Sequence, residues 1–363
     1  MVSEIMGVPS RNTFKSVKSS NTFKAPYPPR IHCARGWNAK WEKTFKTSKL
    51  IISTVLLANS RYIEFMDSIP IDRLLSPRDL AEAIGMSESS LKRWADRGLL
   101  EVTRTAGGHR RITVKDAIKF IREKHLRILN PTAIGLPGIS ASGVEDIDDE
   151  TQALLDHLVN GQIAEAWHFL MGRYLAGASI AELGDGPIRS VLKELGDRWD
   201  HDSDGIFIEH RATDLCVQVV QQMRHIASPN VPVFRATGGA VSNDPYLLPS
   251  MLVASVIAEN GGDATNLGPN TPVDVLRIDS VNRPESERPD LVWISTSIVE
   301  DPELISRQIT QFADECHEYG ILLAVGGRDV DKLKLAARPG LSIHESLAGF
   351  GKVARMIAAS RSK

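Results

Sequence analysis

Hydrophobic positions follow two different spacings along this chain of 363 residues. Between residues 71 and 228 the apolar side chains recur at helical intervals, whereas beyond Val231 short apolar runs alternate with helical stretches. This change of spacing predicts a multidomain protein, in which helical domains precede an α/β domain.

The first 49 residues show neither spacing and are rich in Ser, Thr, Asn, Pro and Lys, a composition typical of disordered chain. Regular patterning begins only near Met66. Residues 1–70 are therefore expected to be disordered or to form an over-long N-terminal extension. Both Met1 and Met66 stay open as the start of translation.

A compact helical module follows this extension. Residues Ser76–Asp79 combine an N-cap serine, a proline at the first helical position and a capping-box acid, so a helix is expected to start there. Ser87 then caps a second helix, in which Leu91 and Trp94 fall at helical spacing and face inward. Two short helices joined by a tight glycine turn predict a helix-turn-helix.

A hairpin is expected next, because Val102–Thr105 and His109–Thr113 flank the glycine-containing turn Ala106–Gly108. Thr113 then opens a further helix with a capping pattern. The sequence therefore predicts a winged helix-turn-helix over residues 71–126.

Three motifs of this module resemble the winged DNA-binding domain of MerR-type regulators: Leu75–Ala81, Leu91–Leu100 and Arg104–Ile112. The resemblance implies binding to double-stranded DNA, with the second helix in the major groove and the basic hairpin near phosphates. A basic surface can also be merely solvated, but here the cations gather on the two elements that meet DNA in such folds. The candidate DNA-binding residues are Ser89, Ser90, Lys92, Arg93, Arg104, His109, Arg110 and Arg111.

The net charge of −2 hides an uneven distribution. Residues 1–50 hold ten Lys and Arg against two Asp and Glu, and residues 72–127 hold thirteen against eight. The rest of the chain therefore has 20 basic against 35 acidic residues, a net charge of −15. A basic N-terminal part followed by an acidic remainder is typical of a chain whose N-terminal part binds a polyanion.

Residues 127–149 contain Pro131, Pro137 and scattered glycines, which predicts a linker. Residues 150–228 then show only helical spacings, in four successive stretches. Four helices with short glycine-containing joins predict a four-helix bundle.

Residues 229–361 contain five apolar runs that alternate with helical stretches. The expected strands are Val231–Ala236, Ala264–Leu267, Leu291–Thr296, Ile321–Val325 and Leu341–His344. The expected helices are Leu247–Glu259, Val273–Ile278, Glu303–Glu318, Val330–Ala336 and Leu347–Ala358. Five βα units predict a flavodoxin-like doubly wound parallel sheet, which binds ligands at the carboxyl ends of its strands. The loops that carry Asp244, Ser295 and Gly326 should therefore meet at one edge.

The bundle and the sheet together resemble the cobalamin-binding half of CarH-like light-responsive repressors, and the related domains of methionine synthase and corrinoid proteins. Three fragments carry this resemblance: Trp199 with Glu209-His210, the turn Leu267–Pro272, and Ser295–Ser297 with Gly326-Gly327. It implies a ligand held between the bundle and the edge of the sheet. The residues implied for ligand binding are Trp199, Glu209, His210, Asp244, Tyr246, Thr271, Ser295, Ser297, Gly326 and Gly327.

The motif that supplies the lower imidazole of cobalt in that family is altered in this chain. Asp244 is retained, but Tyr246 stands in place of the histidine and Pro249 in place of a glycine. A phenol must lose a proton with a pKa near 10 before it binds a metal, whereas a neutral imidazole binds directly. Cobalamin is therefore a cofactor by resemblance only, and these residues assure no cofactor or metal site.

Other chemistries find little support in the sequence. The cysteines, Cys33, Cys216 and Cys316, are odd in number and too far apart for zinc-ligand spacing, and the glycine pairs match no Walker or dinucleotide fingerprint. No apolar run approaches the roughly 20 residues of a membrane-spanning helix. These patterns favour a non-enzymatic protein of the reducing cytoplasm.

The sequence thus predicts a cytoplasmic transcription regulator that binds a DNA operator as a homo-oligomer, either a dimer or a tetramer. Its bundle and sheet would sense a ligand or a partner and control oligomerisation. Three alternatives stay open for the sensor: cobalamin without a protein ligand to cobalt, another small molecule in the same place, or a regulatory protein. Two other functions also stay open, namely a corrinoid-binding carrier or methyltransferase subunit, and an architectural DNA binder that responds to no ligand.

Overall fold

The computed structural model describes residues 69–136, 139, 147–198 and 203–361. The chain divides into two units, Met1–Tyr62 and Ile63–Lys363, and every described residue lies in the second. The expected N-terminal extension up to residue 68, with both alternative translation starts, therefore falls outside the described residues.

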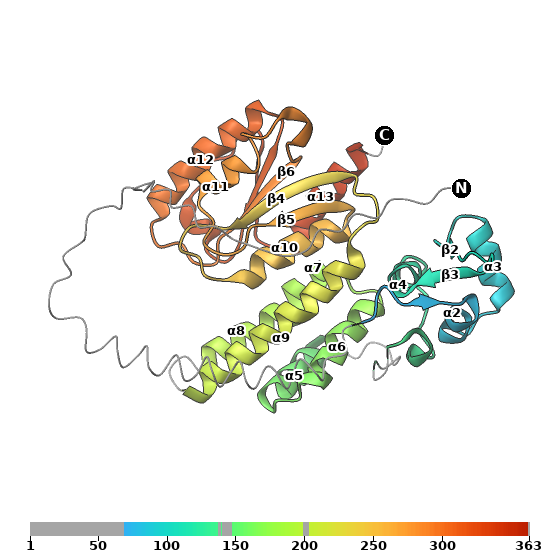
Figure 1. Cartoon of the computed structure of the whole chain (residues 1–363). Helices are drawn as coiled ribbons and strands as arrows, with labels where there is room; N and C mark the ends of the chain where they lie inside the picture. The colour runs from blue at the N-terminus through green and yellow to red at the C-terminus, as the bar shows by residue number, and fades with distance from the viewer. Residues whose placement is uncertain (1–68, 137–138, 140–146, 199–202, 362–363) are drawn as a thin grey trace, which may run out of the picture. The chain divides into compact units, whose positions relative to one another are not determined.

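The N-terminal head (residues 69–123) combines helices with a small antiparallel sheet (Figure 1). Ser76 and Asp79 exchange the two hydrogen bonds of a capping box at the start of the first helix, and Gly85 ends that helix with a φ of 65°. The helix-turn-helix and the hairpin expected from the sequence are both present. The elements are β1 (Leu74–Leu75), α2 (Pro77–Ile84), α3 (Glu88–Asp96), β2 (Thr103–Arg104), β3 (Arg110–Thr113) and α4 (Val114–Glu123).

The stretch after α4, which its prolines and glycines marked as a linker, is partly packed. A short 3-10 helix, η1 (Pro131–Ile134), forms there. Four aliphatic side chains of this stretch belong to the same core as the head: Ile128, Ile134, Leu136 and Ile139. Burial of these side chains favours packing of the stretch against the core, which its prolines and glycines alone did not predict.

The helical segment (residues 147–227) contains helices throughout its described part. A π turn, η2 (Gly184–Ile188), includes Pro187 and joins two of these helices. The turn separates a short helix from the longer helix that follows it, and the hydrophobic spacing alone did not predict this short helix. The helices are α5 (Ile147–Val159), α6 (Ile163–Leu175), α7 (Ile180–Leu183), α8 (Arg189–Arg198) and α9 (Ser203–Ala227).

The sheet segment (residues 234–361) has five parallel strands in the order β5-β4-β6-β7-β8. This is the order 2-1-3-4-5 of flavodoxin-like doubly wound sheets. The strands are β4 (Phe234–Ala240), β5 (Gly262–Asn266), β6 (Leu291–Ser295), β7 (Leu322–Gly326) and β8 (Leu341–His344). The helices between and after them are α10 (Leu247–Glu259), α11 (Val273–Ile278), η3 (Glu285–Glu287), α12 (Pro302–Glu318), η4 (Val330–Leu333) and α13 (Leu347–Arg361).

Two elements of the sheet segment differ most from the prediction. Strand β4 begins at Phe234 rather than Val231, because Pro232 has no N–H for the ladder, and it continues through the glycines at 238 and 239. The helix expected at Val330–Ala336 is only a short 3-10 turn, which Lys334 ends in the left-handed region with a φ of 47°.

Both faces of the parallel sheet are covered, with α10 and α13 on one face and α11 and α12 on the other (Figure 1). The side chains of β6 alternate between them. Leu291 and Trp293 join a core that also contains the helical segment and the head, whereas Val292 and Ile294 join a second core. Burial of both faces explains why the central strands β6 and β7 are nearly continuous apolar runs.

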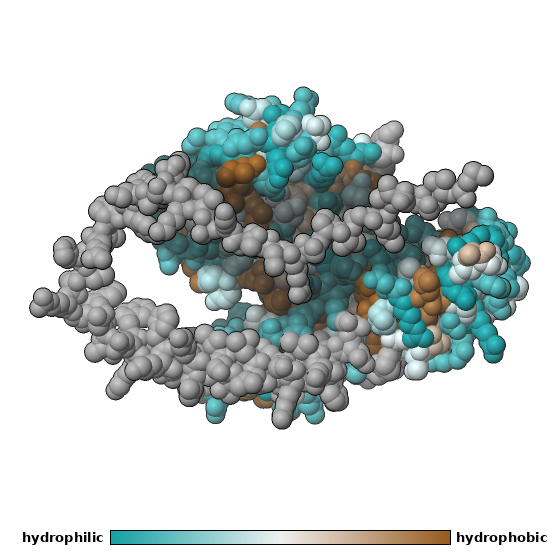
Figure 2. Space-filling view, in the orientation of Figure 1, coloured by the Kyte–Doolittle hydropathy of each residue, from teal (hydrophilic) through white to brown (hydrophobic). Residues whose placement is uncertain are grey.

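Apolar surface is limited on the side of the molecule drawn in Figure 2, where hydrophilic side chains dominate and hydrophobic ones form separate patches. Exposed large hydrophobic residues include Ile206 and Phe207 near the start of α9, and Tyr246 and Leu247 before and at the start of α10. None of the helices described is long and apolar enough to cross a membrane.

Candidate functional site

Helix α3 has an apolar face turned inward and a polar face turned outward. Leu91 is buried, and Trp94 packs half-buried against Phe120, with ring centroids 5.1 Å apart. The helix therefore docks through its apolar face and leaves the other free for a partner. That outward side carries the four residues of this helix proposed to contact DNA: Ser89, Ser90, Lys92 and Arg93.

Short polar contacts order the outward face of α3. The Ser87 hydroxyl caps the helix by accepting from the Ser90 amide at 3.2 Å, and it lies 3.0 Å from the Ser89 hydroxyl. Lys92 pairs with Glu88 at 2.8 Å, and Arg93 donates to Ser90 at 3.2 Å. Exposed contacts of this kind contribute little to stability, so a phosphate can replace them at small cost.

The hairpin stands beside α3 and adds further basic residues. Strands β2 and β3 pair antiparallel, and Gly108 at the turn has a φ of 75°. Arg104 and His109 are exposed and Arg111 is half-buried. Arg110 instead forms an ion pair with Asp96 at the end of α3. This pair joins the hairpin to the helix, so the eight proposed DNA-contacting residues occupy two connected elements.

Arg122, in α4, connects the head to both other segments. Its guanidinium lies over the Tyr174 ring, 3.6 Å from the ring centroid, and donates to the backbone carbonyls of Tyr174 and Ala178 in the helical segment. It also pairs with Glu259, at the end of α10, at 2.8 Å. The second oxygen of Glu259 accepts from the Ile180 amide at 2.9 Å. One cation therefore holds three segments together.

A second polar contact joins the head to the loop before β4. The Asn230 side chain donates to Glu101 of the head at 2.7 Å. It also approaches Asp116, at the start of α4, at 3.4 Å. The head is thus held at both ends of α4 by side chains from other segments.

At the sheet edge, Asp244 is fully buried between two strand-end loops. One carboxylate oxygen accepts from the Tyr246 amide at 3.0 Å, and the other accepts from the Ser297 amide at 2.6 Å and the Ile298 amide at 3.4 Å. The carboxylate therefore joins the loop after β4 to the loop after β6. Both of its oxygens accept hydrogen bonds within the protein.

The Tyr246 ring is 42% exposed, and the Arg328 guanidinium lies 6.0 Å from the ring centroid. Arg328 donates to the Ser297 carbonyl at 2.8 and 3.1 Å. The neighbouring Asp329 is buried, which raises its pKa, but hydrogen bonds from Lys332 and the Val299 amide lower the pKa overall. Two charged residues that follow β7 thus fix the loop after β6.

The glycines implied for ligand binding are surrounded by protein atoms. A Cβ atom added at Gly326 would come 2.5 Å from the His344 carbonyl oxygen, and one at Gly327 would come 2.7 Å from the Thr296 backbone. Thr271, another residue implied for ligand binding, packs in the same way: a Cβ atom added at Gly239 would come 2.6 Å from its hydroxyl, which itself donates to the Gly268 carbonyl. These glycines therefore allow close packing of the protein itself at the positions where a side chain would stand.

The N-terminus of α13, at the same edge, also has an internal partner. Asp185, in the π turn of the helical segment, accepts from the Leu347 amide at 3.0 Å and the Ala348 amide at 2.9 Å. The free amides at the start of a helix favour an anion. Here the carboxylate of Asp185 takes that place, so a phosphate would have to displace it.

The candidates on the helical segment are only partly described. Glu209 and His210 lie in α9, with His210 Nε2 3.5 Å from Glu209 Oε2, and Thr213 donates to Glu209 at 3.1 Å. Trp199 lies outside the described residues. Within the described part of the chain, no hydrogen bond or ion pair joins Glu209 or His210 to the residues of the sheet edge.

One polar atom at the sheet edge lacks a protein partner. The Ser295 hydroxyl is buried at the end of β6 and makes no hydrogen bond among the described residues. The hydroxyl is therefore free to bind water or a small ligand. No group of three or more His, Cys, Asp or Glu side chains that could hold a metal ion occurs in the described ranges.

Several residues that organise these sites were not identified from the sequence. Arg328 had a weak signal, because it follows the glycine pair at a strand end. Arg122, Asp185 and Glu259 had none, since their partners lie between 52 and 163 residues away along the chain.

Residues 75–123 match the model of the MerR HTH family regulatory protein, which spans β1 to α4 of the head. None of the curated proteins matches the sequence.

Some solved structures are also similar to this chain. They include the monomethylamine corrinoid protein of Methanosarcina barkeri, with a TM-score of 0.43, 15% identity, and coverage of 58% of this chain and 99% of that one. The methanol:cobalamin methyltransferase complex MtaBC of the same organism has a TM-score of 0.29 and 17% identity, with coverage of 58% of this chain and 80% of that one. A cobalamin-binding protein from Desulfitobacterium hafniense DCB-2 has a TM-score of 0.30 and 15% identity, with coverage of 59% of this chain and 99% of that one.

Replacing Asp244 by asparagine should lower the free energy of unfolding by about 1–3 kcal/mol, because the amide group that replaces one carboxylate oxygen would face a backbone N–H. Urea unfolding of the full chain measures this loss. Asp331→Asn, an exposed aspartate with no side-chain contact in the described residues, is the matched control. Equal stability of the two variants would contradict the role given to Asp244.

Replacing Arg122 by alanine should lower the free energy of unfolding by about 2 kcal/mol at neutral pH, because Glu259 loses its cation. Burial raises the pKa of Glu259 and Arg122 opposes that rise, so the pKa should rise further in the variant. A carboxyl with a raised folded-state pKa stabilises the fold at low pH, and this stabilisation is lost as the pH rises through that pKa.

The deficit of Arg122→Ala should therefore be larger at about pH 8 than at about pH 5, measured by urea unfolding. The double variant Arg122→Ala/Glu259→Gln is the control, since it has no carboxyl left to titrate at this position. A deficit in Arg122→Ala that does not change with pH would contradict the ion pair.

Proposed function

We propose that this protein is a DNA-binding transcription regulator whose head reads double-stranded DNA. The observation that carries the proposal is the MerR match over residues 75–123, because α3 and the hairpin, with their outward cations, lie inside it. Clustered cations on a helix-turn-helix are suited to phosphate contacts that position the protein, while helix side chains contact base edges.

In this proposal the hairpin of β2 and β3 is the wing of a winged helix. Arg104, His109 and Arg111 are then placed to meet the phosphates that flank the groove entered by α3. Arg110 has a positioning role, since its ion pair with Asp96 sets the hairpin against α3. The outward residues of α3 would contact the base edges.

The rest of the chain is assigned to sensing and oligomerisation. The proposed domains are residues 71–126 for DNA binding, 127–149 for the connection, 150–228 for a four-helix bundle and 229–361 for the sheet domain. A single head neutralises few phosphates, so operator binding would require a dimer or a tetramer. Helix α4 ends at Glu123, too early for a long dimer helix, so the subunit contacts would come from the later segments.

The residues at the sheet edge do not fit cobalamin held through a protein imidazole. Tyr246 occupies the implied ligand position, and the carboxylate of Asp244 is committed to backbone amides. The indole of Trp293 fills the space beside Gly238 and donates to Ser250 at 3.1 Å. A different small molecule or a regulatory protein therefore suits this chain better as the sensed partner.

Replacing Arg104 and Arg111 together by alanine should weaken binding of the full chain to a short random-sequence duplex. Loss of two phosphate contacts should reduce the slope of log K against log salt concentration by about 1.8, at about 0.9 for each contact. Fluorescence anisotropy of a labelled duplex, at several salt concentrations, measures both quantities.

The control for this experiment is Arg307→Ala/Lys352→Ala, which removes the same charge from exposed positions of the sheet segment. Its affinity and salt slope should match those of the unchanged protein. An equal loss in the two double variants would mean that overall charge, and not the head, attracts DNA.

The rival function, a corrinoid carrier or methyltransferase subunit, predicts retention of the vitamin. We expect the full chain, mixed in the dark with adenosylcobalamin or methylcobalamin and then desalted, to be colourless in its visible spectrum. Retained colour in the unchanged protein would revive the rival. The variant Tyr246→His tests whether the missing imidazole explains the lack of vitamin binding, because it supplies that imidazole.

A further inference from the structure

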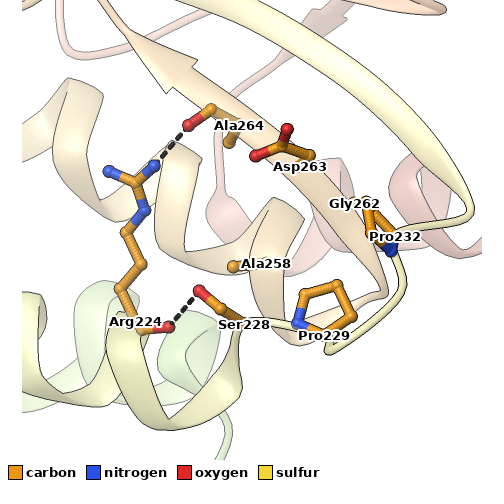
Figure 3. Close-up of a pocket in the computed structure, with 8 residues that line it drawn as sticks. All are labelled: Arg224, Ser228, Pro229, Pro232, Ala258, Gly262, Asp263 and Ala264. Carbon is orange, nitrogen blue, oxygen red and sulfur yellow. Dashed lines mark hydrogen bonds between the residues drawn. The ribbon is translucent and has the colours of Figure 1, made fainter. Parts of the chain in front are cut away.

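A cavity of about 220 Å³ lies away from the sheet edge and from the DNA-binding candidates, between the end of α9 and the start of β5. Its lining combines a cation, an anion and small apolar surfaces (Figure 3). Because β5 starts here, the cavity is at the amino end of that strand, opposite the edge at which doubly wound sheets bind their ligands.

Arg224 is held in place at one side of this cavity. Its guanidinium donates to the carbonyl oxygen of Ala264, and the Ser228 hydroxyl donates to the Arg224 carbonyl at 2.7 Å (Figure 3). Burial lowers the pKa of Arg224, and the negative charge of Asp263 partly offsets this effect. The guanidinium has further N–H groups besides the one used, so it has donors left for an anion.

Asp263 lines the same cavity and carries the opposite charge. Although the two charges influence one another, no ion pair joins Asp263 to Arg224 in the described ranges of the chain. Asp263 is exposed and its carboxylate makes no hydrogen bond to a described residue. A cation and an anion that line one cavity without pairing match a ligand that has both charges.

We propose that this cavity binds a small zwitterion of the α-amino acid class. Arg224 would bind the carboxylate through its remaining N–H groups, and Asp263 would bind the ammonium group. Pro229, Pro232 and Ala258 supply an apolar wall for a short side chain. A simple anion is a poorer ligand, because Asp263 would repel it.

The position of the cavity also couples it to the head, and this step rests on the proposed DNA-binding function. The loop that supplies Ser228, Pro229 and Pro232 to the wall carries Asn230, which donates to Glu101 of the head. A ligand that orders this loop therefore changes how the head is held. The effector reaches DNA binding through the Asn230 contact.

Isothermal titration of the full chain with L-alanine tests the site. L-alanine should bind saturably, whereas L-lactate, which lacks the ammonium group, and L-alaninol, which lacks the carboxylate, should bind at least tenfold more weakly. Asp263→Asn should weaken L-alanine binding at least tenfold and leave the fold intact, since this side chain is exposed. Asp331→Asn is the matched control and should bind as the unchanged protein does.

Three results would overturn the site: no saturable heat with L-alanine, equal binding of L-lactate, or unchanged binding in Asp263→Asn. Arg224→Lys is a second variant that keeps the charge and loses the guanidinium geometry, and it should also weaken binding. Circular dichroism shows whether this less exposed position still folds.

The coupling is measured separately, by anisotropy with the labelled duplex. Saturating L-alanine should change the DNA affinity of the unchanged protein severalfold, and Asn230→Ala should abolish this change while L-alanine still binds. Binding of L-alanine with no effect on DNA affinity would overturn the coupling and leave the site. Absence of DNA binding with or without L-alanine would instead refute the proposed function.

Discussion

The apolar face of the parallel sheet that α10 covers belongs to a core that does not stop at the sheet. Trp293 from β6, Leu170 from α6 and Ile118 from α4 all contribute to it. Because a parallel sheet must bury both faces, the helical segment and the head complete the cover that α10 and α13 begin. The arrangement of the three segments depends on this shared burial, because it keeps the head beside the segments that would regulate it.

Burial of apolar surface does not by itself fix how the segments are oriented, because the hydrophobic effect is not directional. Polar contacts between the segments fix that orientation. Arg122 reaches from the head to Tyr174 and Glu259, and Asp185 reaches from the helical segment to the start of α13. Asn230 adds a third contact, from the loop before β4. In each contact, a charged or amide side chain of one segment forms hydrogen bonds with another segment. The orientation of the head therefore depends on a few bonds that a ligand or partner can change.

At the sheet edge, residues that resemble those of a ligand-binding family make their contacts within the protein. Asp244 accepts from backbone amides of its own loop and of the neighbouring loop, and Gly327 makes room for the Thr296 backbone. Such residues maintain the shape of the edge whether or not a ligand is there. A likeness in residue type is therefore weaker support for a ligand than the surroundings of each atom.

Local chemistry in the sequence determined the elements of the head and most of the sheet, because the capping box at Ser76 and the alternating apolar runs act over a few residues. It also placed the cations of α3 and the hairpin correctly on those elements. It did not reveal the pairing of Arg110 with Asp96, the packing of Ile134 into the shared core, or the cavity beside Arg224. Those features join residues far apart along the chain, so only the tertiary structure decides them: burial and charge pairing depend on which surfaces meet, and no local pattern records that.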